Sequence, residues 1–254
     1  NVPTGTKVKL TATILRTSAT QKNKTVQLMK KLKVNPGDTD AFGTRPTDRT
    51  ISLGRADAFK LVAVLDSEEA STDAIVPSLT LGTITGTFTR GERIIGSSSK
   101  AEGRIIDISS PMEHILTSVS NFTTSDTITG QSSGATATIT AVTEGSENIT
   151  NNFVFDTGQR DNFYDIARIT RKQNVSAPTG RLMIIYDYFE HESGDVFTVD
   201  SYNDVADQMT FEDIPIYSAT KVDPDAPQPT GEFPLTDCYA VSYTHLRAHE
   251  TATY

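Results

Sequence analysis

Two stretches of the chain share one pattern of hydrophobic and polar positions, 34 residues apart. Residues 88–107 read FTRGERIIGSSSKAEGRIID, and residues 122–141 read FTTSDTITGQSSGATATITA. In each copy an acidic residue (Glu92 or Asp126) begins an alternation of apolar and polar positions, a Gly/Ser-rich segment interrupts it, and a second alternation follows. Alternation with period two around a polar turn predicts two β-strands joined by that turn. The sequence therefore predicts a duplicated β-hairpin.

A period of about 34 residues also suits helical repeats, but these need an apolar position every three to four residues. The run Thr136–Thr140 alternates with period two, which argues against helices. An isolated hairpin is only marginally stable in water. We therefore expect the two copies to pack on each other or on a neighbouring sheet.

The turns of the two copies are where we first expect partner contacts, because the shared positions are mostly apolar while the turns differ. Lys100, for example, stands where the second copy has Gly134. The candidate contact residues are Ser97, Ser98, Ser99, Lys100, Gln131, Ser132, Ser133 and Gly134.

The first third of the chain contains further strand patterns. Residues 6–15 alternate lysine with Val and Leu and predict an amphipathic strand. The lysines of residues 22–33 are interpreted as a solvated strand face or as guards of a sheet edge, because charge on an edge blocks strand addition. Residues 59–65 predict a buried strand that follows a bend at 54–57.

The last third contains the most pronounced strand pattern, RLMIIYDYF at residues 181–189. After a turn at 191–195, residues 196–202 are its predicted hairpin partner. The strand carries aromatic residues on both faces, which favours core packing between two sheets over binding of a sugar or a partner. Ile214-Pro215 predicts an edge or an extended arm.

These patterns predict an all-β fold with sandwich-like domains and an inserted tandem β-hairpin module. The expected parts are an N-terminal β-sandwich part (1–77), the repeat module (78–150), a C-terminal β part (151–222), a Pro-rich linker (223–238) and a non-native tail (239–254). The first and third parts are either halves of one domain, with the repeats inserted between them, or separate units on a string.

Composition narrows the choice of partners. The chain of 254 residues has a formal net charge of −9, which argues against nucleic acid and anionic membrane surfaces. No apolar run approaches the roughly 18 residues of a membrane-spanning helix. The single cysteine, Cys238, argues against an internal disulfide framework and a cysteine-based metal cage.

Few side chains are candidates for catalysis or metal binding, and we expect no catalytic residue, cofactor or metal site. His114 is expected on the surface between the repeats, and His191 in a solvated turn. The acidic residues Asp156, Asp161 and Asp165 are spaced too widely for a calcium loop and are interleaved with arginines, which favours local ion pairs.

Several segments resemble virion structural proteins of marine tailed phages. The resemblance rests on SLGRADAFKL (52–61), GQSSGATATI (130–139), DTGQRDNFYDIARI (156–169), LMIIYDYFEHESGDVFTVDSY (182–202) and YSATKV (217–222). The family consists of large tail, baseplate or fibre-associated proteins of contractile-tailed cyanobacterial phages. The resemblance implies a β-rich particle component without catalytic residues, located in the virion tail and assembled in the host cytoplasm.

Beyond Cys238 the resemblance ends. Residues 241–254 resemble a translated sequencing adapter, so His245 and His249, which are spaced like zinc ligands on a helix, are not interpreted as a metal site.

Two functional hypotheses remain. The first is a structural virion component whose partners are other virion proteins and further copies of itself. The second is a glycan- or receptor-binding β module of a tail fibre or a bacterial surface adhesin, with a host-surface glycan as partner.

Overall fold

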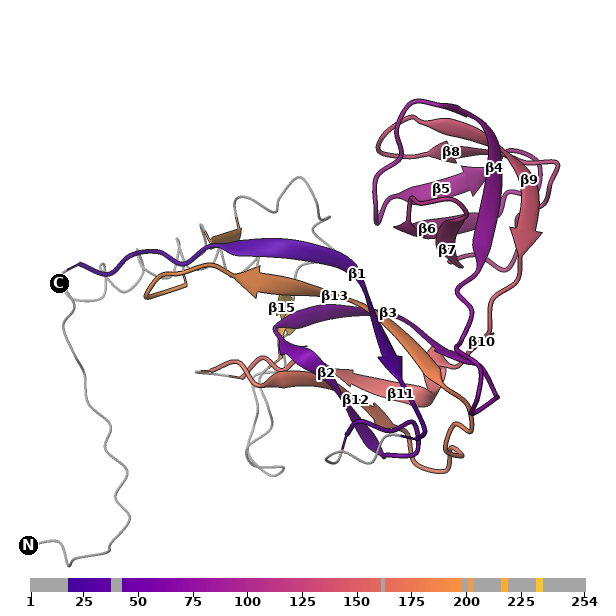
Figure 1. The fold of residues 1–254 in the computed structure, drawn as a ribbon. Helices are drawn as coiled ribbons and strands as arrows, with labels where there is room; N and C mark the ends of the chain where they lie inside the picture. Colours follow the sequence, from indigo (N-terminus) through magenta and orange to yellow (C-terminus); the bar gives the residue numbers. More distant parts are fainter. Residues whose placement is uncertain are drawn as a thin grey trace, which may run out of the picture.

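The regular secondary structure of the described residues is almost all β-strand, so the all-β prediction is confirmed (Figure 1). The computed structural model describes residues 18–37, 43–160, 163–197, 201–202, 216–218 and 232–234. Within them, two open sheets and a closed barrel account for most strands, and a short 3-10 helix, η1 (Thr150–Asn152), follows the barrel in the chain.

The larger open sheet has four antiparallel strands in the order β1-β13-β3-β10. Their bounds are β1 (Lys24–Val34), β13 (Leu182–His191), β3 (Ala58–Asp66) and β10 (Glu147–Asn148). Strand β13 pairs with β1 on one side and with β3 on the other. The segments before and after the repeats therefore contribute strands to the same sheet.

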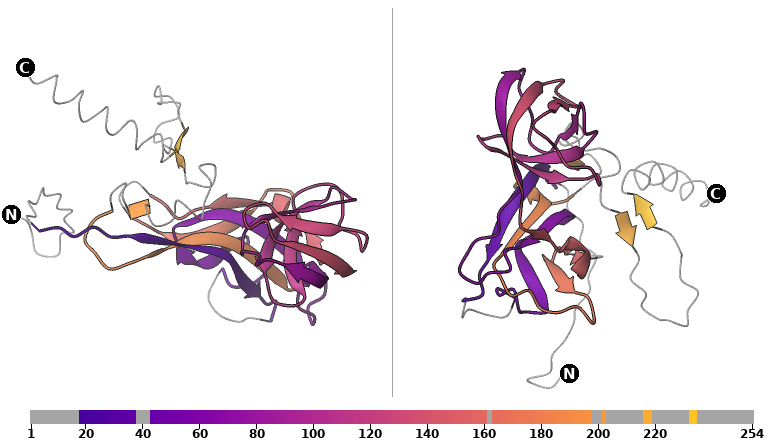
Figure 2. Two further views of the ribbon diagram at one scale, coloured as in Figure 1. Left: turned by 90° about the horizontal axis from the view of Figure 1, so that it is seen from above. Right: turned by 90° about the vertical axis from the view of Figure 1, so that its right-hand side faces the viewer.

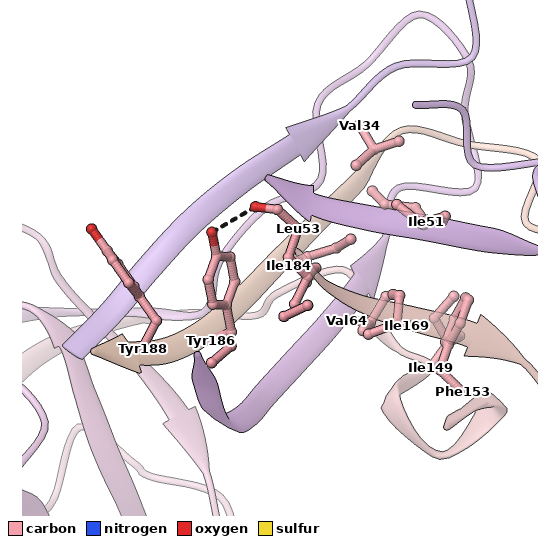
Figure 3. Packing of buried hydrophobic residues seen from close by; sticks show 13 residues of the cluster. Val34, Ile51, Leu53, Val64, Ile149, Phe153, Ile169, Ile184, Tyr186 and Tyr188 are labelled. Atoms are coloured by element: carbon pink, nitrogen blue, oxygen red, sulfur yellow. Dashed lines mark hydrogen bonds between the residues drawn. The ribbon is translucent and has the colours of Figure 1, made fainter. Parts of the chain in front are cut away.

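The smaller open sheet has the order β11-β12-β2. These strands are β11 (Phe153–Asp156), β12 (Ile166–Arg171) and β2 (Thr50–Ala56). Its apolar side chains and those of one face of the larger sheet share a single hydrophobic cluster (Figure 3). Within it, the hydroxyl of Tyr186 donates a 2.8 Å hydrogen bond to the carbonyl oxygen of Leu53, which joins the two sheets.

The repeats form a closed barrel with the strand order β4-β7-β6-β5-β8-β9. The strands are β4 (Ser78–Thr85), β5 (Arg93–Gly96), β6 (Glu102–Asp107), β7 (Met112–Leu116), β8 (Thr127–Gly130) and β9 (Thr136–Thr143). The first copy supplies β5 and β6 and the second β8 and β9, with the polar turns between them as predicted.

The two copies pair directly through β5 and β8, which confirms that they pack on each other. Ile95 lies opposite Thr129, its equivalent in the other copy, and the flanking pairs are Ile94 with Gly130 and Gly96 with Ile128. Because equivalent residues exchange places across this pair, a local pseudo-two-fold axis passes between Ile95 and Thr129.

The barrel lies beside one end of the open sheets (Figures 1 and 2), and its side chains contact the outer face of the larger sheet there. One apolar cluster contains Met29, Ala63, Leu65, Ala74, Val76, Ile106, Ile115, Met183 and Ile185, and so combines residues of the sheet, the barrel and their connection. Lys31 of β1 adds an ion pair with Glu113 of β7 at 2.7 Å.

This packing explains the apolar run over residues 182–186 of β13. Ile184 and Tyr186 face the smaller sheet, whereas Met183 and Ile185 face the barrel. A strand that is covered on both faces needs no polar alternation, and its first eight residues are all buried.

Some predicted elements differ from the structure. Residues 196–202 were expected to pair with β13, but that prediction is wrong, because β1 and β3 already occupy both sides of β13; Val196 instead forms a parallel bridge with Gln21. Strand β15 (Glu232–Pro234) lies in the predicted linker and pairs with β14 (Ile216–Ser218). The predicted strand at 6–15 and the tail at 239–254 lie outside the described residues.

Candidate functional site

The most unusual polar group of the described chain is a fully buried ion pair between Lys24 and Asp57. The Lys24 Nζ atom lies 2.6 Å from Asp57 Oδ2, and both side chains are completely inaccessible to solvent. Nζ also donates hydrogen bonds to the hydroxyl oxygens of Tyr164 at 2.9 Å and Tyr202 at 2.7 Å. All three donors of the ammonium group thus have partners.

Both oxygens of Asp57 accept further hydrogen bonds. Oδ2 lies 2.7 Å from His191 Nε2, in addition to Lys24, and Oδ1 accepts a bond of 2.6 Å from Gln159 Nε2. The side chain of His191 is 22% exposed, so the network reaches solvent through this imidazole.

Aromatic rings surround the ammonium group of Lys24. The Nζ atom lies between 4.6 and 5.1 Å from the ring centroids of Tyr202, Tyr164, Phe197 and Phe189. Ring faces attract a cation and exclude water, so they favour a lysine at this buried position.

Segments far apart in the sequence bring these groups together. Lys24 begins β1 and His191 ends β13, and these two residues are opposite each other in the sheet. Asp57 occupies the bend between β2 and β3 with a φ of 55°, and Gln159 and Tyr164 form a bridge in the connection from β11 to β12. Positive φ is uncommon outside glycine, although Asp tolerates it better than most residues.

Burial sets the ionisation behaviour of the site. Desolvation lowers the pKa of Lys24, and the attraction of Asp57 only partly opposes this effect. Burial acts to raise the pKa of Asp57, but the hydrogen bonds from His191 and Lys24 outweigh it and hold that pKa below its ordinary value. Desolvation raises the pKa of the Tyr164 and Tyr202 hydroxyls, which therefore stay neutral.

This site corrects two predictions. Lys24 was grouped with solvated lysines, an interpretation that holds for the exposed Lys30, Lys31 and Lys33 of β1 but not for Lys24. His191 was placed in a solvated turn, but it is the last residue of β13 and contacts a buried carboxylate. One indication that Lys24 is buried is present in the sequence. Lys24 and Val26 are two residues apart on one strand, so their side chains lie on the same face, and Val26 is buried.

The turns that were predicted to contact a partner form hydrogen bonds within the barrel. Asp126 of the second copy accepts hydrogen bonds on Oδ1 from the amides of Ser98 and Ser99, both at 2.8 Å. Reciprocally, Glu92 of the first copy accepts bonds from the amides of Ser132 and Ser133 at 3.3 and 3.1 Å. Each acid of the repeat therefore anchors the turn of the other copy.

This exchange explains why an acid and two serines recur at the same places in both copies. Because β5 and β8 are antiparallel, the two turns lie at opposite ends of this strand pair and do not form one surface. The side chains of Ser97, Ser98, Lys100, Gln131, Ser132 and Ser133 and the backbone of Gly134 are exposed, while Ser99 is half-buried. Partner contacts through these residues remain a prediction.

His114 is buried, which contradicts its expected place on the surface. It lies on β7 with 2% of its surface exposed, and its ring packs edge-on against Phe122 with centroids 5.2 Å apart. Burial lowers the pKa of its imidazole to about 4. Its Nδ1 atom has no hydrogen-bond partner among the described residues.

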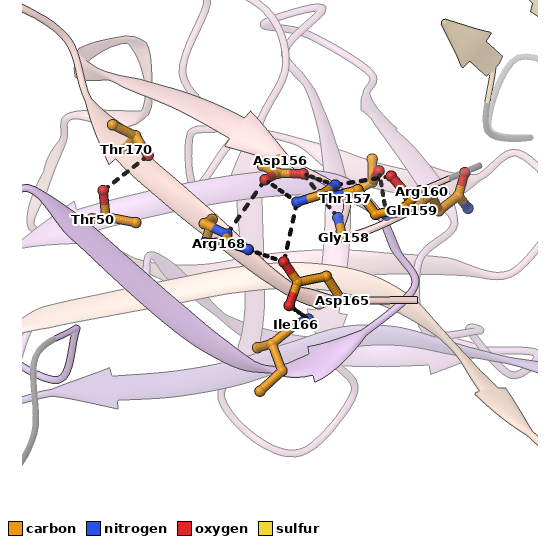
Figure 4. Close-up of polar contacts among 10 residues, drawn as sticks. All are labelled: Thr50, Asp156, Thr157, Gly158, Gln159, Arg160, Asp165, Ile166, Arg168 and Thr170. Carbon is orange, nitrogen blue, oxygen red and sulfur yellow. Dashed lines mark hydrogen bonds and ion pairs between the residues drawn. The ribbon is translucent and has the colours of Figure 1, made fainter. Parts of the chain in front are cut away.

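The acidic residues of the β11–β12 connection form ion pairs, as predicted (Figure 4). Asp156 lies 2.8 Å from Arg160 and 3.4 Å from Arg168, and Asp165 contacts both arginines. Asp161 lies outside the described residues.

The described ranges contain no group of three or more His, Cys, Asp or Glu side chains that could hold a metal ion. No helix in them is long and apolar enough to cross a membrane. Cys238, His245 and His249 lie outside those ranges.

Comparison with protein-family models, with curated proteins and with solved structures found no match.

Proposed function

We propose that this chain is a structural component of a tailed-phage virion, in the tail, the baseplate or a fibre-associated part, and acts through subunit contacts. The observation that carries the proposal is the contact of a repeat-built barrel with the face of a sheet, through one apolar cluster and the Lys31–Glu113 ion pair. Such a unit presents fixed surfaces, which assembly requires. The resemblance to phage structural proteins supports the same conclusion.

The outer face of the smaller sheet and its neighbourhood offer a surface for a second copy of the chain. Val154, Phe163 and Ile166 are 54%, 57% and 50% exposed, close to the ion pairs of Asp156 and Arg168. Exposed large apolar side chains beside charged groups are typical of subunit interfaces. The partners are accordingly other copies of this chain and other virion proteins, in a tail assembled in the host cytoplasm.

Self-association tests the surface. We expect light scattering after size-exclusion chromatography to show a homo-oligomer. Ile166→Asp should raise the dissociation constant of this oligomer at least ten-fold. Val119→Asp is the matched control, because Val119 is fully exposed on the barrel away from this face. A monomer at high concentration, or equal effects of the two variants, would contradict the proposed contact.

The virion assignment has its own test. Peptides of residues 182–191 should be found by mass spectrometry in nuclease-treated phage particles purified from the source of this sequence, in proportion to other tail proteins. Their absence from particles in which the other tail proteins are found would refute the proposal.

The exposed hydroxyl and amide side chains of the barrel turns favour a second candidate, a glycan- or receptor-binding module. Because the two turns lie at opposite ends of β5–β8, each would act separately. Binding to a host-surface glycan that is lost in Gln131→Ala and kept in Val119→Asp would support this alternative.

A further inference from the structure

We propose that Lys24 and Asp57 become joined by an intramolecular isopeptide bond, which the folded chain forms on its own with release of one water molecule. This inference concerns covalent self-modification and does not depend on the proposed virion role. It rests on the geometry of the buried network, in which the amine and the carboxyl group are already in contact at 2.6 Å.

The fold holds the amine and the carboxyl group in positions that favour a reaction between them. Nζ is tied by Tyr164, Tyr202 and Asp57 at the same time, which restricts its orientation. Holding two reactants in place turns a bimolecular reaction into a unimolecular one and can raise the effective concentration to about 10⁵–10⁸ M. Both side chains have no solvent exposure, so water does not compete for the carboxyl group.

The two oxygens of Asp57 have different neighbours, and these correspond to different tasks. Oδ1 accepts the amide hydrogen of Gln159, which can stabilise the negative charge that develops when nitrogen attacks the carboxyl carbon. Oδ2 contacts both Lys24 and His191, so the leaving oxygen lies next to two proton donors.

The atoms balance without any co-reactant. Lys24 first transfers one proton to Asp57 Oδ2, which leaves a neutral amine and a carboxylic acid. The Nζ lone pair then attacks Cγ, and a bond from nitrogen to carbon forms while Oδ1 takes up negative charge. One of the two protons on Nζ then passes to the Oδ2 hydroxyl, which also contacts His191, the bond from Cγ to Oδ2 breaks, and water leaves. The carbonyl at Oδ1 forms again, and an amide with one hydrogen on Nζ remains.

The surroundings favour the product over the ion pair. Removing two charges from water is costly even when they are paired. Burial lowers the pKa of Lys24, which favours the neutral amine. Burial also acts to raise the pKa of Asp57, but the contacts with His191 and Lys24 keep it low, so the proton transfer to Asp57 is the uphill step. An amide carries no net charge, so its formation removes the cost of two buried ions inside a cage of aromatic rings.

The bond would connect the first residue of β1 to the bend between β2 and β3. Strand β1 is an edge strand of the larger sheet and contributes Met29 and Lys31 to the contact with the barrel. A covalent link would therefore hold the edge strand that anchors the barrel.

Intact-mass spectrometry of the purified full chain under denaturing conditions tests the proposal. We expect a mass lower than that of the sequence by one water molecule. Protease digestion should yield one branched species in which the peptides of Lys24 and Asp57 are joined. A full-length mass with both peptides free would overturn the proposal, as would a water loss confined to one peptide, which indicates an aspartyl succinimide.

Variants separate the chemistry from the fold. Lys24→Arg keeps the positive charge but cannot form this amide, so the full mass should return. Gln159→Ala keeps both reacting groups, and loss of a single donor to the developing oxyanion should slow linkage roughly 100-fold. The linked fraction is measured at fixed times after cell-free synthesis, with Tyr186→Phe as a matched control that should link at the normal rate. Linkage in Gln159→Ala as fast as in the unaltered chain would refute the role of Gln159.

Discussion

Acid should destabilise this protein through His114, a residue that the barrel buries in its neutral form. The imidazole is 2% exposed on β7 and packs against Phe122, and burial lowers its pKa to about 4. In the unfolded chain a histidine titrates near 6.5. Between these two values the unfolded chain binds a proton that the folded chain does not.

The size of the effect follows from the difference between the two pKa values. Each unit corresponds to about 1.4 kcal/mol, so the free energy of unfolding should fall by about 3 kcal/mol. The stabilisation is fully present above pH 6.5, is lost progressively as the pH falls to about 4, and does not change further below that. Stability falls with pH in this way for any base whose pKa is lower in the folded state than in the unfolded state.

Urea unfolding of the natural chain and of His114→Leu between pH 4 and pH 7.5 measures this contribution, because the difference between the two proteins removes the titration of other groups. At pH 7.5 the variant should be at least as stable, since it loses a buried Nδ1 atom without a hydrogen-bond partner in the described structure. At pH 4 it should be more stable by about 3 kcal/mol. A difference that does not change with pH, or an NMR titration of the His114 ring with a midpoint near 6.5, would refute the reasoning.

Three further substitutions test other contacts by the same urea assay. Asp126→Ala removes the acceptor of three backbone amides and should cost about 1–3 kcal/mol above pH 5. Although burial acts to raise it, the hydrogen bonds from these amides and a serine hydroxyl lower the pKa of Asp126, so the cost should vanish as the pH falls through that lowered pKa. Gly91→Ala should cost about 1–3 kcal/mol, because Gly91 has a φ of 84° and an added Cβ would lie 2.7 Å from Leu28 of β1. Tyr186→Phe should cost about 1 kcal/mol through the loss of its buried hydrogen bond to β2.

Matched variants show which outcomes would contradict these expectations. Gly37→Ala, where an added Cβ meets nothing within 4 Å, should change stability by less than about 0.5 kcal/mol. If Gly91→Ala behaves the same way, the contact between barrel and sheet does not constrain this position. Asp126→Asn keeps one acceptor oxygen and should lose less than the alanine variant. A Tyr186→Phe protein as stable as the natural chain would mean that the bond between the sheets contributes nothing net.

Local patterns in the sequence identified several strands of this protein. The alternation in the two repeats located β5, β6, β8 and β9, and the strand pattern at residues 181–189 located β13. They also indicated that each repeat copy packs on the other copy or on a neighbouring sheet, because a lone hairpin cannot bury its apolar face, and the structure shows the first of these. These inferences succeed because strand formation depends on neighbouring residues with period two.

The tertiary structure alone decided which strands pair and which polar groups are buried. Lys24 meets Asp57 across 33 residues, and His191 meets the same carboxylate across 134. Strand parity assigns a side chain to a face of its sheet, but whether water, a second sheet or a barrel covers that face depends on distant segments. For this reason His114 and Lys24, each predicted to be exposed, are buried, and the recurring acids Glu92 and Asp126 anchor each other's turns.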